Sequence, residues 1–172
     1  MPTRVLADVD GSGEKTTCFF KGFGAGEGSL MEKELEKHLQ IHRSTLARET
    51  LLSRLLGIVQ DTDGSVSGLL LTYVDHDGHG LLAYSLHDDT PLQDKEQWAT
   101  QVRESLQQLH QRGIVWGDVK ASNVMIDKDS NAWIIDLGGG YTLGWVDEEL
   151  AGTMEGDRQG LERVVDYIFN ED

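Results

Sequence analysis

One short segment limits the folds open to this chain more than any other feature. A loop carries three polar side chains at offsets of 0, 2 and 5, namely Asp118, Lys120 and Asn123. A mainly apolar segment over 124–127, which ends in Asp127, follows at once, and an apolar run over 132–135 comes after a polar turn. We predict two strands around this turn, with Asp136-Leu137-Gly138 directly after the second strand.

This pattern resembles the catalytic loop and metal-binding motif of the protein-kinase-like superfamily, D-x-K-x-x-N followed by a strand and D-[FL]-G. The resemblance implies that one loop and one hairpin converge on a single point. It implies ATP and Mg²⁺ as cofactors, with Asn123 and Asp136 as metal ligands, because hard Mg²⁺ prefers oxygen donors. By the same resemblance, Asp118 orients the acceptor and acts as base, and Lys120 places positive charge near the transferred phosphoryl group.

The resemblance extends upstream to a nucleotide site. An apolar strand that runs into Thr72 and Val74 resembles the hinge strand, whose backbone is expected to bind the adenine edge. Lys21 ends a β-rich run and resembles the lysine that contacts the ATP phosphates. Glu34 resembles the helix glutamate that pairs with this lysine, and Glu36 is the alternative if the helix register differs.

Two further residues are placed by the resemblance. Asp157 resembles the aspartate that braces the catalytic loop, and a plain N-cap role in the last helix is the alternative. His110 lies near the end of the helix that leads into the loop, and we expect it to pack rather than to bind a ligand. The stretch 138–161 is most similar to kinase-like proteins of fungi.

The chain departs from the family pattern in three places. No G-x-G-x-x-G precedes Lys21, Trp116-Gly117 stands where His-Arg is usual, and no A-P-E follows Asp136. A glycine in place of that arginine removes the dock for a phosphorylated activation segment. We therefore expect an α+β, two-lobed kinase-like fold with a reduced N-lobe over 1–74 and a truncated C-lobe over 75–172.

Periodicity predicts the elements around these motifs. Further predicted strands cover 4–10, 16–21, 57–60, 68–74 and 115–116, and predicted helices cover 30–41, 94–112 and 157–169. Ser29 is the expected N-cap of the first helix, with Glu32 completing a capping box. Gly113 is the expected signal for the end of the second helix.

Composition restricts the partners of the chain. The 15 Lys and Arg against 30 Asp and Glu give a net charge of −15. This charge disfavours nucleic acids and anionic membranes as partners, because both are negatively charged. The single cysteine, Cys18, excludes an intramolecular disulfide and a cysteine-built zinc site. With no signal-peptide pattern and no run of roughly 20 apolar residues, we expect a cytoplasmic protein.

These observations favour an ATP-dependent phosphotransferase of the Ser/Thr protein-kinase-like type, acting on a hydroxyl acceptor in a protein or a small molecule. Two alternatives stay open. The departures from the family pattern fit a pseudokinase or a nucleotide-binding scaffold, whereas Trp116-Gly117-Asp118 resembles the x-G-D form of small-molecule hydroxyl kinases. Shortened lobes would leave apolar faces uncovered, so a homodimer or a protein partner is also expected.

Overall fold

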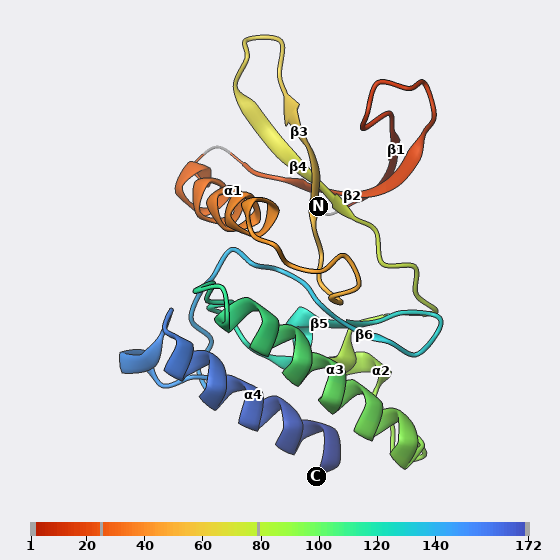
Figure 1. Ribbon diagram of the computed structural model, residues 1–172, viewed down its shortest axis with the longest axis vertical. Helices are drawn as coiled ribbons and strands as arrows, with labels where there is room; N and C mark the ends of the chain where they lie inside the picture. Colours follow the sequence, from red (N-terminus) through yellow and green to blue (C-terminus); the bar gives the residue numbers. More distant parts are fainter. Residues whose placement is uncertain (1–2, 25, 79, 171–172) are drawn as a thin grey trace.

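The structure, a computed structural model, describes residues 3–24, 26–78 and 80–170. Its elements in chain order are β1 (Thr3–Ala7), β2 (Thr16–Gly22), α1 (Gly28–Arg43), β3 (Leu55–Gln60), β4 (Val66–Thr72), α2 (Leu82–Ser85), α3 (Leu92–His110), the 3₁₀ turn η1 (Ala121–Asn123), β5 (Val124–Ile126), β6 (Ala132–Ile134), the 3₁₀ turn η2 (Glu148–Leu150) and α4 (Met154–Phe169). Strands β1 to β4 form one antiparallel sheet that has α1 beside it. Helices α2 and α3 pack against the β5–β6 hairpin, and α4 packs against α3 (Figure 1). The fold is mixed α and β, as predicted.

The sheet has the order β1-β2-β4-β3, so β2 is an interior strand with a partner on each side. Side chains alternate between the faces of a strand. Phe19 and Lys21 therefore share one face, and Phe20 lies on the other, where its ring crosses β4 at Gly68. A side chain at Gly68 would collide with that ring, so glycine is required for this crossing. The face that carries Lys21 is turned towards the rest of the molecule.

The helical part is organised around α3. Its buried apolar residues recur every three or four positions, as expected for a helix with one face in the core: Trp98, Val102, Leu106 and Leu109. The helix closes where the Ile114 N–H donates to the Leu109 carbonyl oxygen, with Gly113 at φ +72° between them. This is the glycine-terminated end that the sequence predicted.

Helix α4 closely approaches the predicted catalytic loop, the segment that holds Asp118, Lys120 and Asn123. A Cβ atom on Gly160 would lie 2.7 Å from Val119 Cβ and 3.0 Å from the Val119 carbonyl oxygen. A Cβ atom on Gly156 would meet the Leu150 carbonyl. The glycines therefore bring α4 directly against the loop that holds Asp118.

The substitution Gly160→Ala is expected to destabilise the protein, even though alanine is favoured over glycine by about 1 kcal/mol inside a helix. Overpacking against Val119 costs typically 1–3 kcal/mol and outweighs that preference. Urea unfolding monitored by circular dichroism measures the difference. Gly28→Ala is the control, because position 28 has open space around it; a gain in stability for Gly160→Ala would contradict the close contact.

Two local predictions are wrong. Ser29 does not cap the first helix, because α1 already begins at Gly28 after Glu27, which makes no side-chain capping bond. Residues 115–116 are not a strand. The backbone N–H of Trp116 donates to a carboxylate rather than to a strand partner. The short helix α2 was not predicted.

Candidate active site

A cavity of about 500 Å³ lies between the sheet and the helical part. Its polar wall contains four of the predicted site residues, Lys21, Glu34, Asn123 and Asp136. Its apolar wall includes Phe19 and Leu71 from the sheet and Met125 and Ile135 from the hairpin. Thr72 and Val74 line the same cavity, so the predicted hinge and the predicted metal ligands share one space.

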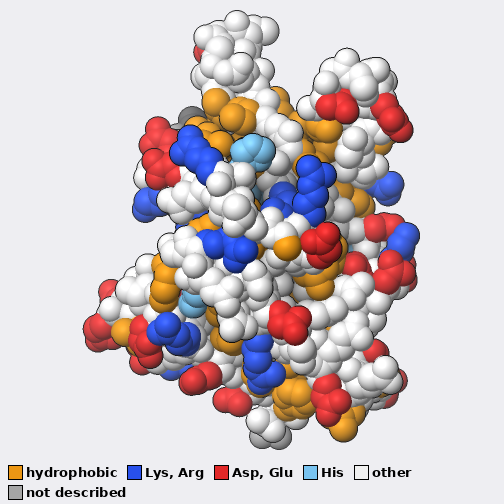
Figure 2. Space-filling view, in the orientation of Figure 1, with side chains coloured by type: hydrophobic (Ala, Val, Ile, Leu, Met, Phe, Trp, Pro, Cys, Tyr) orange, Lys and Arg blue, Asp and Glu red, His pale blue; other side chains and the backbone are white. Residues whose placement is uncertain are grey.

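The chain as a whole is acidic, with a net charge of −15. In the space-filling view, acidic side chains are scattered along the edges of both parts, and several Lys and Arg side chains lie near the middle of the face (Figure 2). Within the described ranges, no helix has both the length and the apolar character needed to cross a membrane.

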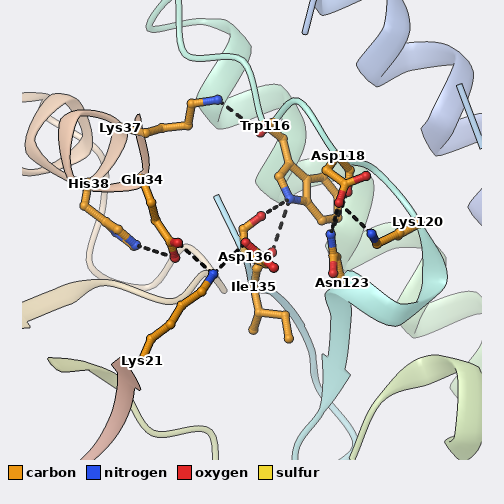
Figure 3. Close-up of polar contacts among 10 residues, drawn as sticks. All are labelled: Lys21, Glu34, Lys37, His38, Trp116, Asp118, Lys120, Asn123, Ile135 and Asp136. Carbon is orange, nitrogen blue, oxygen red and sulfur yellow. Dashed lines mark hydrogen bonds and ion pairs between the residues drawn. The ribbon is translucent and has the colours of Figure 1, made fainter. Parts of the chain in front are cut away.

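Lys21 is held between two carboxylates (Figure 3). Its Nζ lies 2.6 Å from Glu34 Oε2 and 2.9 Å from Asp136 Oδ1. Burial lowers the pKa of Lys21, but the charges of Asp136 and Glu34 outweigh it, and the pKa is raised from its ordinary value. The lysine is therefore charged at neutral pH. The expected Lys21–Glu34 ion pair is present, and the alternative with Glu36 is wrong, because that side chain is exposed.

Glu34 reaches Lys21 from α1, the helix beside the sheet. Its side chain is only 2% exposed, so its negative charge is shielded from water and needs a cation beside it. Gly138 makes room for it, since a Cβ atom there would lie 3.2 Å from Glu34 Oε2 and 3.5 Å from Asp136 Oδ1. The Lys21, Glu34 and Asp136 side chains thus form one connected group.

Asp118 lies at the centre of a hydrogen-bond network in the catalytic loop. Its Oδ2 is 2.6 Å from Lys120 Nζ and accepts a bond of 3.0 Å from Asn123 Nδ2. Its Oδ1 accepts a bond of 3.0 Å from the hydroxyl of Thr142, which in turn accepts from Lys120 Nζ at 2.9 Å. The carboxylate therefore already holds a hydroxyl group in this geometry.

The orientation of Asn123 follows from its own bonds. Its Nδ2 donates to both the backbone oxygen and Oδ2 of Asp118. Both amide hydrogens are used there, so Oδ1 is the atom left to accept or to coordinate, and the residue lines the cavity. Together with the Asp136 carboxylate, which is 43% exposed, it supplies the kind of oxygen donors that suit Mg²⁺.

The described residues contain no cluster of three or more His, Cys, Asp or Glu side chains that could hold a metal by itself. Mg²⁺ does not need such a cluster, because it usually keeps several waters and binds through one or two carboxylates together with substrate phosphates. The pair of Asn123 and Asp136 fits this kind of site.

The backbone of Asp136 is in a strained conformation. Its φ angle is +53°, a left-handed value that only a few per cent of non-glycine residues adopt. The indole Nε1 of Trp116 lies 3.2 Å from the carbonyl oxygens of Ile135 and Asp136 and donates to them. Strain of this kind persists when surrounding contacts fix it, and it concentrates at functional sites.

Asp157 fastens the catalytic loop to α4. Its Oδ2 accepts from the Trp116 N–H and its Oδ1 from the Gly117 N–H, each at 2.7 Å. The ring of His110 lies 2.8 Å from Oδ2, and the Asp157 side chain is 2% exposed. These bonds are the ones expected of an aspartate that braces the loop before Asp118. The alternative, in which Asp157 is only the N-cap of the last helix, is wrong, because Thr153 caps α4 by accepting from the Gly156 N–H.

Sequence reasoning missed three contributors to the site: Thr142, the indole of Trp116, and Lys37, whose Nζ donates to the Trp116 carbonyl oxygen at 3.1 Å. Each contacts a residue far away in the chain, so no local pattern predicted the contact. The sequence hint for Thr142 is that a hydroxyl residue follows Asp136 after a short run of glycines.

The comparisons with known proteins agree with this geometry. The family model of the protein kinase domain matches residues 26–153. A "Dual serine/threonine and tyrosine protein kinase" from Xenopus laevis is 31% identical over 110 residues, which are 60% of this chain. The chain spans only 12% of the length of that relative. The matched range includes the catalytic loop and Asp136, whereas Lys21 and Asp157 lie outside it and are brought to the site by the fold.

Proposed function

The chain belongs to the protein kinase domain family, and on that premise we propose that it transfers the γ-phosphoryl group of ATP to a hydroxyl acceptor. The observation that carries the proposal is the Asp118 carboxylate, which holds a hydroxyl on one oxygen and Lys120 and Asn123 on the other. Phosphoryl transfer needs positioning and charge stabilisation more than covalent help from the protein.

In this proposal the cavity binds ATP. The backbone at Thr72 and Val74 takes the adenine edge, and Lys21, kept charged and in place by Glu34, contacts the phosphates. Asn123 and Asp136 would hold Mg²⁺, which when bound neutralises phosphate charge. We also propose that residues 1–74 and 75–172 are two lobes with this cavity between them.

The acceptor hydroxyl is proposed to replace Thr142 at Asp118 Oδ1. Asp118 orients this hydroxyl and takes its proton, as the acceptor oxygen forms a bond to the γ-phosphorus and the bond to the β–γ bridging oxygen breaks. ADP then leaves with the electrons of that bond. Lys120 lies beside Asp118 Oδ2 and places a positive charge where the phosphoryl group passes.

We propose a serine or threonine hydroxyl of a protein as the acceptor. The similarity to a kinase named for serine/threonine and tyrosine supports a protein acceptor. The alternative of a small hydroxyl compound draws on Trp116-Gly117 before the catalytic aspartate. A screen of serine- and threonine-containing proteins against aminoglycosides, choline and sugars, with labelled ATP, separates the two.

The primary test is a calorimetric titration of ATP with and without Mg²⁺. We expect Mg²⁺-dependent binding by the wild type and roughly 100-fold weaker binding by Asp136→Ala, because a metal ligand is lost. Asp129→Ala is the matched control, since this aspartate is exposed in the turn between β5 and β6. Equal binding by the wild type and Asp136→Ala would contradict the proposed metal site, and no binding by the wild type at millimolar ATP would favour the pseudokinase alternative.

A further inference from the structure

Helix α1 makes two separate links from neighbouring positions on one side. Glu34 and Lys37 are three residues apart and are therefore neighbours on the helix surface. Glu34 points to Lys21 of the sheet, and Lys37 Nζ donates to the carbonyl oxygen of Trp116 in the catalytic loop at 3.1 Å (Figure 3). One helix thus contacts the phosphate-binding lysine and the loop that carries Asp118.

The link from Lys37 depends on glycines in the loops that face it. A Cβ atom on Gly117 would lie 3.3 Å from Lys37 Nζ and 3.2 Å from Gly139 Cα. Both glycines have positive φ angles, +91° and +71°, which other residues rarely adopt. The ammonium group therefore occupies the space into which a side chain at position 117 would project.

Lys37 is half-buried. Its side chain borders a second cavity of about 330 Å³, which Gly117 and Gly139 also line. Burial lowers the pKa of Lys37, while the charge of Asp157 opposes that change. A hydrogen bond from such a partly desolvated ammonium to a carbonyl is stronger than an exposed one.

Trp116 is the residue at which these contacts meet. Its N–H donates to Asp157 of α4, its carbonyl accepts from Lys37 of α1, and its indole donates to the carbonyl of Asp136. Its side chain is fully buried, so it cannot move without moving its partners. The position of α1 is therefore connected to the residues directly before Asp118 and to the backbone of Asp136.

We infer that Lys37 is a positioning residue, which anchors α1 to the catalytic loop and thereby holds Glu34 against Lys21. This inference rests on the proposed phosphotransferase function. An anchor of this kind suits a chain that has glycine at position 117, where an arginine would bind a phosphorylated segment. Here a lysine of α1 itself holds the helix against the loop, and no phosphorylated segment is needed.

The first test compares turnover and nucleotide affinity in matched variants. Lys37→Met keeps the length of the side chain and removes its donors, and we expect it to lower kcat about tenfold, the cost of one hydrogen bond from a charged group. Lys37 does not line the nucleotide cavity, so it can change the affinity for ADP with Mg²⁺ only through Lys21, and we expect this loss of affinity to be smaller than the loss of kcat. Lys37→Arg, which restores a donor, should regain most of the lost kcat. Lys33→Met, an exposed lysine of the same helix, should match the wild type.

A double-mutant cycle with Glu34→Gln tests whether Lys37 acts through the Lys21–Glu34 pair. If it does, Lys37→Met lowers kcat much less in the Glu34→Gln background than in the wild type. Fully additive losses would overturn the inference, as would wild-type kcat in Lys37→Met. Thermal unfolding of each variant shows whether a lost activity is only lost folding.

Hydrogen exchange gives a readout that needs no activity. Backbone amides of residues 34–43 are expected to exchange about tenfold faster in Lys37→Met and at the wild-type rate in Lys33→Met. Unchanged exchange in Lys37→Met would overturn the anchor even if the enzyme is active. Faster exchange in Lys37→Met, together with a wild type that transfers no phosphate, would support the anchor while the proposed function fails.

Discussion

Replacing Asp118 with asparagine is expected to lower the rate of phosphoryl transfer by about 10³-fold, the usual contribution of a positioned general base. The amide has nearly the same size and keeps one acceptor oxygen for Thr142, but it cannot take the acceptor proton. Lys120 and Asn123 both donate to Oδ2 of the Asp118 carboxylate. In Asp118→Asn, the neutral side-chain amide of residue 118 faces these two donors in place of the charged carboxylate. The loss is therefore expected in kcat.

The measurement is the release of ADP in the presence of the acceptor found in the screen. ATP binding by calorimetry should stay within about threefold of the wild type, because Asp118 is not among the residues that line the nucleotide cavity. Asp129→Asn, the same chemical change at an exposed position, serves as control. Wild-type turnover in Asp118→Asn would remove Asp118 from the proposed mechanism.

The largest effect on stability is expected for Asp157→Ala. The substitution leaves the N–H groups of Trp116 and Gly117 without their acceptor and also removes the partner of the His110 ring. An unsatisfied buried group costs about 1–3 kcal/mol, so a loss of about 3–4 kcal/mol in unfolding free energy is expected. Activity should be lost as well, because these N–H groups lie directly before Asp118.

Denaturant unfolding followed by circular dichroism gives this difference as a shift of the midpoint at constant slope. Asp157→Asn keeps one acceptor oxygen and should lose about half as much. Glu162→Ala, at an exposed position of the same helix, is the control. An unchanged midpoint for Asp157→Ala would mean that the catalytic loop does not depend on this brace.

The sequence predicted best where chemistry and spacing are local. The loop at Asp118, the β5–β6 hairpin and the end of α3 at Gly113 depend on neighbouring residues, and the structure has each of them. The Lys21–Glu34 pair was also predicted, although it spans two elements, because the family resemblance supplied the pairing that the local pattern could not.

The failures have physical causes. The Glu27 side chain accepts a hydrogen bond of 2.6 Å from the Gly24 N–H. The helix begins at Gly28, directly after Glu27, and therefore before the predicted cap at Ser29. Val115 and Trp116 favour a strand by propensity, but within the described residues no strand pairs with them, and the Trp116 N–H donates to the carboxylate of Asp157 instead. Tertiary contacts decided both cases.

Several predictions stay predictions. They are the reduced N-lobe and truncated C-lobe, the similarity to fungal proteins, the cytoplasmic location, the absence of nucleic-acid and membrane partners, and the homodimer or protein partner. The roles of Thr72, Val74, Asn123 and Lys120 are part of the proposed function and depend on the titrations above.

The bonds between Asp157 and the catalytic loop also determine when the site can form during synthesis. A ribosome releases the chain from its N-terminus at roughly 5–20 residues per second, so Lys21 emerges early and Asp157 late. Until α4 has been made, the N–H groups of Trp116 and Gly117 have no carboxylate to bind. The nascent chain therefore carries an unorganised catalytic loop, and its organisation waits for contacts of long sequence separation, which form slowly.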